Sequence, residues 1–224
     1  MQEREDDPVM HDVSGNNRHG TYGLRAWSYS GSPVPTSSFG AYGSSNFTTT
    51  GLGTRIDVPI DSADEWLDYP SNFTVEIGIM GHRGWPGGSG TAIRDTPADA
   101  DAADGRWSIE HVGDYPTHIS ATITTAPGVT ATLDYEAGAQ DTLSYVSHVV
   151  ALRVDSDNLE ASLWVNGERA DVHTLSAPVP SLTRTSRGLT IGEMPGYFAH
   201  AAIFYTALSD QALVRHAQNA GVYE

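Results

Sequence analysis

The sequence contains no cysteine and no lysine. Without cysteine, the chain can form no disulfide framework, no thiolate zinc site and no thiol nucleophile, so its stability must come from packing. The 12 basic residues are all arginine, and 28 acidic residues bring the formal net charge to −16. Affinity for nucleic acid comes mainly from cations that neutralise phosphates. We therefore expect no binding to nucleic acid or to an anionic membrane surface.

Long apolar runs are also missing. No segment approaches the ~20 apolar residues that a transmembrane helix needs, and this predicts a soluble protein. Residues 1–7 are mostly charged and no apolar stretch follows them, so we expect neither a secretory signal nor a membrane anchor. The exclusive use of arginine indicates a GC-rich coding genome rather than a property of a site.

The residues that are abundant favour β-structure. The 224 residues include 23 glycines and 12 prolines, and 39% of the chain is apolar, which is typical of many turns between short strands. Apolar and polar residues alternate, as expected of half-buried strands, at 55–60, 73–79, 107–112, 118–124, 129–135 and 148–154. We expect strands 55–60 and 73–79 to have one solvent-facing side, and one or two further strands in the first 50 residues.

Local signals at the end of the chain are sharper. Runs 159–165 and 168–175 flank Asn166-Gly167, a pair that suits a type I′ hairpin turn because both residues tolerate positive φ. Ser209 is placed to cap a short helix that carries Asp210 in its first turn and apolar residues at 212, 213 and 217. Residues 80–105 show no such pattern and predict a long loop, Gly-rich first and acidic afterwards.

Five motifs in order resemble the concanavalin A-like, laminin-G-like jelly-roll family found in surface-adhesion modules and bacteriophage tail proteins. Residues 12–22 are similar to its D-x-S-G-N-x-x-H-G-T opening. The others are F-T-V at 73–75, H-x-V-A-L at 148–152, L-x-V-N-G at 163–167, and a closing strand with an A-L-S turn at 203–209. The resemblance implies an all-β antiparallel jelly-roll β-sandwich with one short C-terminal helix. We expect residues 12–224 to form this single domain, after an N-terminal segment at 1–11.

The chain departs from the family's pattern at three places. Only residues 8–11 precede the opening motif, so the usual first strand is shortened or replaced and a sheet edge is left open. Ser147 stands where the family usually has tryptophan, and Ala199-His200 replaces an acidic pair in the last strand. No ligand or metal role is therefore transferred to those positions.

The sequence offers no catalytic constellation. Glycoside hydrolysis needs two carboxylates. The nearest candidate, Glu110, is a lone carboxylate and is more simply interpreted as a surface residue. Gly87-Gly88-Ser89-Gly90 matches a nucleophile elbow only loosely and lacks its strand-to-helix context. The histidine pairs His11 with His19 and His111 with His118 lack the helical spacing of metal ligands. We therefore predict that the chain is not an enzyme.

Binding residues are predicted in the loops. Sugars stack on exposed aromatic rings and are held by short polar side chains, which favours Trp85 with His82 and Arg83 beside it, and Tyr115 as a second aromatic. Asp99, Asp101 and Asp104 form an oxygen-rich cluster suited to calcium. A solvated acidic loop is the alternative interpretation of the three aspartates.

Together with the resemblance, these features predict a carbohydrate-binding module of a bacteriophage virion. It would lie on the surface of the tail or capsid and recognise a host cell-surface glycan. The alternative is a purely structural virion protein that docks onto neighbouring subunits, where a partner strand adds to the open edge. A homo-oligomer is compatible with both hypotheses, and a glycan hydrolase is the third.

Overall fold

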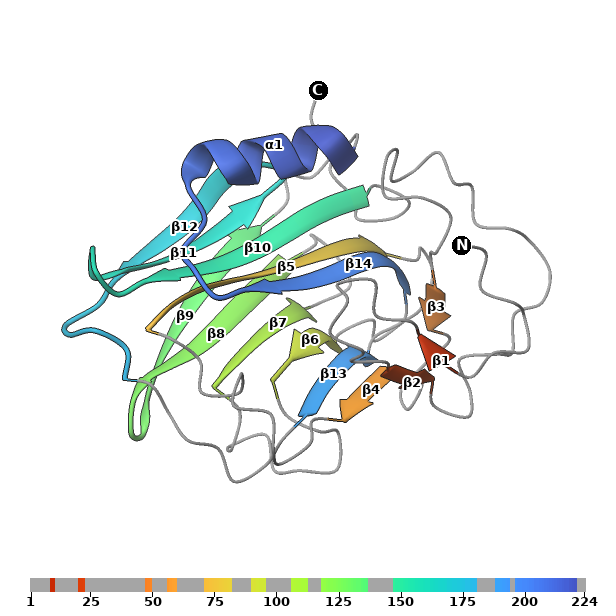
Figure 1. The fold of residues 1–224 in the computed structure, drawn as a ribbon, viewed down its shortest axis with the longest axis horizontal. Coiled ribbons are helices and arrows are strands. Elements are labelled where there is room, and N and C mark those ends of the chain that lie inside the picture. Colours follow the sequence, from red (N-terminus) through yellow and green to blue (C-terminus); the bar gives the residue numbers. More distant parts are fainter. Residues whose placement is uncertain are drawn as a thin grey trace.

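The computed structural model describes residues 9–10, 20–22, 47–49, 56–59, 71–81, 90–95, 106–112, 118–136, 147–180, 188–193 and 196–220. Within them, two antiparallel sheets stack face to face, and a C-terminal helix lies on the outer side of one sheet (Figure 1). The predicted all-β jelly-roll sandwich with one C-terminal helix is confirmed. In this described part of the chain, no helix is long and apolar enough to cross a membrane.

The first sheet has eight strands. In spatial order they are β1 (Val9–Met10), β2 (Gly20–Tyr22), β4 (Ile56–Pro59), β13 (Gly188–Glu193), β6 (Gly90–Arg94), β7 (Trp107–Val112), β8 (His118–Ala126) and β9 (Val129–Glu136).

The second sheet has six strands. Their order is β12 (Glu168–Thr174), β11 (Glu160–Val165), β10 (Ser147–Asp155), β5 (Asn72–Gly81), β14 (Gly196–Phe204) and β3 (Phe47–Thr49). The remaining element is helix α1 (Asp210–Ala220).

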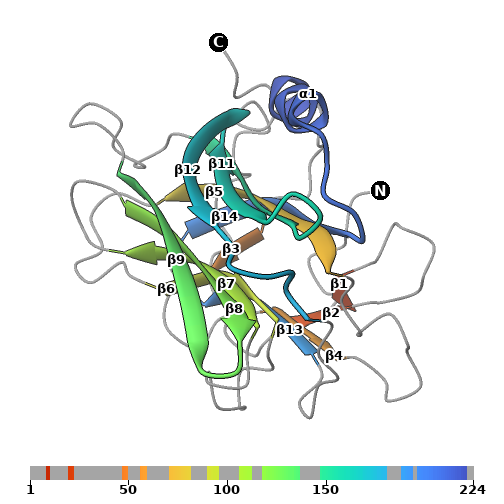
Figure 2. The same cartoon turned by 90° about the vertical axis from the view of Figure 1, so that its left-hand side faces the viewer.

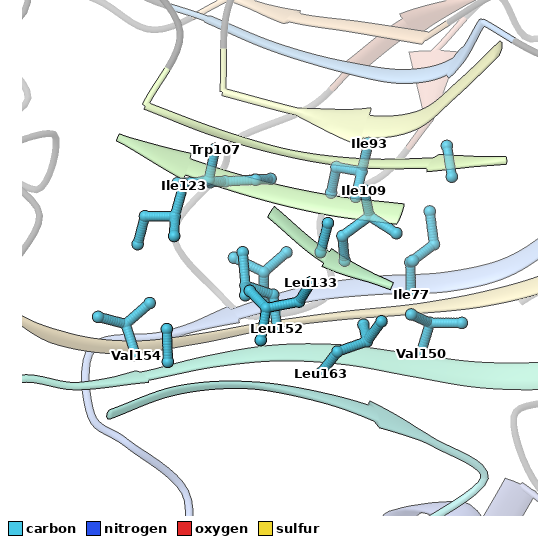
Figure 3. Close-up of a cluster of buried hydrophobic side chains, with 14 of the residues drawn as sticks. Ile77, Ile93, Trp107, Ile109, Ile123, Leu133, Val150, Leu152, Val154 and Leu163 are labelled. Atoms are coloured by element: carbon cyan, nitrogen blue, oxygen red, sulfur yellow. The ribbon is translucent and has the colours of Figure 1, made fainter. Parts of the chain in front are cut away.

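The core lies between the two sheets and follows from the alternation in the strands. Figure 3 shows Ile77, Leu152 and Leu163 of the six-stranded sheet pointing toward Ile109 and Leu133 of the eight-stranded sheet. All five side chains are fully buried. Burial of one such side chain stabilises the fold by roughly 1.5–3 kcal/mol, so the sandwich needs no cross-link to hold its two sheets together.

One predicted loop contains a strand. Strand β6 falls inside the expected loop at 80–105 and lies between β13 and β7, with Ala92 and Ile93 buried. The register of β6 with β7 shifts between Thr91 and Ile93, so two successive residues are buried. Such an irregularity interrupts the period of two on which strand recognition depends, and the prediction of an uninterrupted loop was therefore wrong.

The expectation of a solvent-facing side on strand 73–79 was also wrong. Every residue from Phe73 to Ile79 is buried, including Thr74 and Glu76 on the side away from the core. The hydroxyl of Thr74 donates to the carbonyl of Thr206 and accepts from the backbone N–H of Leu208, each at 3.0 Å. The segment that leads into α1 thus covers this face of β5.

The predicted turn between β11 and β12 is confirmed. Asn166 and Gly167 have φ values of 53° and 80°, as a type I′ turn requires at both central residues. The Asn166 side-chain oxygen also accepts a hydrogen bond from the backbone N–H of Val149 at 2.9 Å. The turn residue therefore fixes the hairpin against β10 as well as reversing the chain.

The predicted helix and its cap are confirmed. The Ser209 hydroxyl accepts a hydrogen bond from the backbone N–H of Ala212 at 3.3 Å, and Asp210 lies in the first turn. Leu213, Ala217 and Ala220 form the buried side of the helix. This apolar stripe lies against the six-stranded sheet.

The two sides of the sandwich end differently. On one side the edge strands β9 and β12 approach each other (Figure 2), and the backbone N–H of Asp134 donates to the Asp171 carboxylate at 2.9 Å. On the other side the sheets end in β1 and β3, of two and three residues. Strand β1 is the described strand that precedes the opening motif.

Candidate functional site

The loop residues predicted to bind sugar lie outside the described residues: His82, Arg83, Trp85 and Tyr115. The strand ends that flank them are described. Gly90, which follows the segment of Trp85, pairs with His111, and Val112 pairs with His118 on either side of the segment of Tyr115. Both segments are therefore attached at the same end of the eight-stranded sheet.

The predicted calcium ligands Asp99, Asp101 and Asp104 also lie outside the described residues. The base of their segment is described, and the buried Asp95 carboxylate accepts from the backbone N–H groups of Arg106 at 2.7 Å and Trp107 at 3.3 Å. These bonds bring the two ends of segment 96–105 together at the far end of β6 and β7 from Gly90. The two predicted sites thus leave the sheet at opposite ends.

Among the described residues, no group of three or more histidine, aspartate or glutamate side chains is arranged to hold a metal ion. His111 and His118 illustrate the reason. His111 pairs with the core residue Ile119 and therefore lies on the core side of the sheet. His118 immediately precedes Ile119 in β8 and therefore lies on the outer side. Because neighbouring residues of a strand point to opposite faces, these two histidines cannot share one metal.

The outer face of the six-stranded sheet is covered over its central strands β5, β10 and β11. Helix α1 lies across β10 and β11 (Figure 1), where Leu213 packs against Ala151 and Trp164. The Arg153 guanidinium lies over the Trp164 ring with its carbon 5.1 Å from the ring centre. The indole N–H of Trp164 donates to the Ser162 hydroxyl at 3.0 Å. The interior of this face is therefore occupied by the protein's own side chains.

Charged groups fix α1 to this face. Arg153 makes hydrogen-bonded ion pairs with Asp210 at 2.5 Å and with Glu160 at 2.7 Å. Burial acts to lower the pKa of Arg153, but the hydrogen bonds and charges of these two carboxylates outweigh it and raise the pKa above its ordinary value. Further along the helix, Nδ1 of His216 lies 2.9 Å from the carboxylate of Glu76, which is 1% exposed.

The outer face of the eight-stranded sheet has a different character. Cross-strand pairing aligns Ser108 with Thr122 and Thr132, and Glu110 with Ser120 and Asp134. We call ten outward-facing polar side chains of these three strands the polar face: Ser108, Glu110, His118, Ser120, Thr122, Thr124, Thr130, Thr132, Asp134 and Glu136. The functional groups of this set are hydroxyls, carboxylates and one imidazole.

Hydrogen bonds order part of the polar face. The Ser108 hydroxyl donates to the Glu110 carboxylate at 2.9 Å and lies 2.7 Å from the Thr122 hydroxyl. Because a hydroxyl has one proton, Thr122 is the donor of the second bond. His118 Nε2 lies 3.1 Å from the Asp134 carboxylate. The side chains are thus held in place before any ligand arrives.

Accessibility rises across the polar face toward β9. Ser108 and Ser120 are 8% and 7% exposed, whereas Thr130, Thr132, Asp134 and Glu136 on β9 are exposed. The most accessible part therefore follows β9, whereas the outward side chains of β8 are partly buried or, at Ser120, buried.

The sequence contained a signal for this face that the search for loops and motifs missed. Residues 118–124 and 129–135 were predicted as strands from their apolar positions, and the intervening positions carry hydroxyl and carboxylate groups. In successive antiparallel strands those positions fall on one face. Reading these polar positions together would have indicated a polar side on the two strands, but the contribution of β7 depends on knowing that it is their neighbour.

No protein-family model matches the chain, and no curated protein matches it in sequence. Solved structures match its fold. The sialidase CBM40 of Ruminococcus gnavus, bound to α2,3-sialyllactose, is 17% identical with a TM-score of 0.59, over 74% of this chain and 93% of that chain. The binding domain of botulinum neurotoxin DC, in complex with rat synaptotagmin II, is 14% identical with a TM-score of 0.65, over 94% and 48%.

A third match is the receptor binding domain of botulinum neurotoxin D, at 13% identity and a TM-score of 0.59, over 77% of this chain and 43% of that chain. The chain thus spans nearly all of the CBM40 module and about half of the neurotoxin domains. At these identities the likeness shows a shared β-sandwich fold. These three structures are of binding modules or binding domains.

Proposed function

We propose that this chain is a non-catalytic carbohydrate-binding module that holds a glycan on the polar face. One observation carries the proposal: three neighbouring strands place ten hydrogen-bonding side chains on one outer face, which is partly accessible along β8 and exposed along β9. Glycans offer many hydroxyl groups, and a site with several fixed polar partners can orient them. On the other outer face, α1 packs over Ala151 and Trp164.

Two findings support this choice of ligand. The CBM40 module of similar fold is bound to a sialylated lactose, so a sandwich of this kind can carry a sugar site. The hydroxyl and carboxylate groups of the polar face are ordered by their own hydrogen bonds, which lowers the entropy lost on binding.

In this proposal Trp85 and Tyr115 supply the apolar contact that a sugar ring needs, with His82 and Arg83 as polar neighbours. Tyr115 is three residues from both Val112 and His118, so chain connectivity keeps it within about 10 Å of those strand ends. Trp85 is five residues from Gly90. Both aromatics are therefore within reach of the end of the polar face that includes His118.

Calcium remains a proposal for Asp99, Asp101 and Asp104. Because the base of their segment lies at the opposite end of β6 and β7 from Gly90, a bound ion would act on the fold rather than on the sugar. A chelator should then lower the melting temperature and leave the glycan affinity of the folded protein unchanged.

The biological setting we propose is the surface of a bacteriophage virion, on the tail or the capsid, where the module recognises a host glycan. The motif resemblance and the arginine-only composition support this setting. A second candidate is a structural virion protein that docks onto its neighbours. The short edge strands β1 and β3 favour it, because they end both sheets on one side of the sandwich and a partner strand could extend them.

The proposed function is tested by binding of the purified protein to a glycan array and to host envelopes, with a Thr132→Val, Asp134→Asn double variant. Each lost hydrogen bond costs about 0.5–1.5 kcal/mol, so affinity should fall about tenfold. The matched control is Thr174→Val, the same change on the exposed strand β12 of the other sheet, which should bind normally. Native binding by both variants would place the glycan site away from the polar face, and no binding by the native protein would favour the structural candidate.

A further inference from the structure

We infer that the polar face selects glycans without carboxylate groups, that is, neutral sugars and above all sugars with free amines. The inference rests on the proposed function and adds the chemical class of the ligand. It depends on two properties of the face: the sign of its charges and the direction of its hydrogen bonds.

The charges of the polar face are mainly negative. Glu110, Asp134 and Glu136 contribute three carboxylates, against one imidazole, His118. That imidazole already contacts the Asp134 carboxylate, with 3.1 Å between the nearest atoms. A ligand carboxylate on this face would approach like charges, which opposes binding.

The directions of the hydrogen bonds on the polar face also disfavour a ligand carboxylate. Ser108 uses its proton on Glu110, and Thr122 uses its proton on Ser108. Thr122 therefore offers only its lone pairs to an incoming ligand, as the carboxylates do, while the nearly buried Ser108 holds Glu110 and Thr122 in this arrangement. An ionised carboxylate accepts hydrogen bonds and donates none, whereas a sugar hydroxyl donates one and an ammonium group donates three. The ordered part of the face thus matches ligands that donate.

Arg94 is the one described cation in the adjoining strand that could oppose this preference. It pairs with Ser108 across β6 and β7. Its side chain is partly buried and already has interaction partners. A ligand carboxylate would therefore have to displace those partners, at the border of the face farthest from the exposed side chains of β9.

The fold comparison alone would suggest another ligand. The CBM40 module of similar fold is bound to sialyllactose, whose sialic acid carries a carboxylate. The charges on the polar face of this chain predict the opposite preference, so the two expectations can be separated by experiment.

Calorimetry should compare four probes: a glucosamine hexamer, its N-acetylated counterpart, sialyllactose and an oligogalacturonate. We expect the glucosamine hexamer to bind most tightly, the N-acetylated hexamer more weakly, and the two carboxylated probes least. Higher salt should weaken only the glucosamine hexamer, because exposed charge pairs are screened.

Variants that remove carboxylates test whether the preference for the glucosamine hexamer comes from the polar face. In Asp134→Asn, Glu136→Gln the affinity for the glucosamine hexamer should fall about two- to tenfold, as expected for two exposed charge pairs. The affinity for the N-acetylated hexamer should change less than that. The control is Glu168→Gln, on the exposed strand β12, which removes a carboxylate elsewhere and should change nothing.

The outcomes distinguish the two proposals. Tighter binding of sialyllactose or oligogalacturonate than of the glucosamine hexamer, reduced by Thr132→Val, Asp134→Asn, would overturn the ligand class and retain the proposed function. Equal loss of glucosamine-hexamer binding in Glu168→Gln would also overturn it, because a general acidic surface would then explain the preference. Binding of none of the probes would remove the proposed function and this inference together.

Discussion

The two outer faces of the sandwich differ in what lies on them. On the six-stranded sheet, the outward side chains Arg153, Trp164 and Glu76 are buried beneath α1 and its ion pairs. On the eight-stranded sheet, the outward side chains of β9 are exposed and entirely polar. The first face contributes to stability, whereas the second is available for a ligand. Polar residues on a strand therefore have opposite roles depending on what the rest of the chain places over them.

On the face of the six-stranded sheet that α1 covers, the largest loss of stability is expected for Trp164→Ala. Trp164 is 5% exposed and packs against Ala151, Leu213 and the Arg153 guanidinium. Loss of a buried aromatic side chain should lower the free energy of unfolding by about 3–5 kcal/mol, measured by urea denaturation. The control is Val172→Ala on β12, where the side chain is 47% exposed, with an expected loss under about 0.5 kcal/mol. Similar losses in both variants would show that α1 does not protect this face.

A smaller effect is expected for Arg153→Met. The change keeps most of the side-chain volume and removes the pairs with Glu160 and Asp210. The expected loss is about 2 kcal/mol, less than for a fully buried pair because the Asp210 side chain is 66% exposed. Hydrogen exchange in α1 should accelerate, and Arg153→Lys should restore only part of the stability because it loses the planar donor geometry.

The pKa of Arg153 sets the pH dependence of this contribution. Its pKa is raised on folding, so the stabilisation is fully present below the ordinary pKa of arginine and is lost only as the pH rises through the raised value. The stability difference between the native protein and Arg153→Met should therefore stay constant between about pH 7 and pH 10. A decline over that range would mean that a group other than Arg153 controls the attachment of α1.

A still smaller loss is expected for Ser209→Ala. The hydroxyl accepts from the backbone N–H of Ala212 at 3.3 Å at the start of α1. Removing such a cap costs about 0.5–1 kcal/mol, and differential scanning calorimetry should record a small decrease in melting temperature. Ser209→Asp should retain the native value, since aspartate also caps helices. Unchanged stability in the alanine variant would show that side-chain contacts alone fix the helix.

The sequence predicts the fold better than it predicts the site. The alternating strands, the Asn166-Gly167 turn and the Ser209 cap are local features, and each depends on residues that are close in the chain. The coverage of β5 depends on Thr74 meeting Leu208, which is 134 positions away. The local alternation of apolar and polar residues does not reveal such a distant contact. Glu76 was therefore expected on a solvent-facing side of the strand, but it is buried.

The candidate site shows the same limit. The loop residues Trp85 and Tyr115 were chosen by chemical type and remain predictions, because they lie outside the described residues. The polar face depends on the register that aligns Glu110, Ser120 and Asp134 across three strands. The residue types are visible in the sequence, but their alignment requires knowing which strands are neighbours.

The smallest effect on stability, and the clearest contrast with the covered face, is expected on the polar face itself. Thr132→Val and Asp134→Asn alter exposed side chains, so each should change the free energy of unfolding by less than about 0.5 kcal/mol. The double variant should nevertheless lose about tenfold in glycan affinity through its lost hydrogen bonds, whereas Trp164→Ala should retain native affinity in its folded fraction. If the polar-face variants instead unfold as readily as Trp164→Ala, both outer faces serve stability, and the glycan site must lie elsewhere.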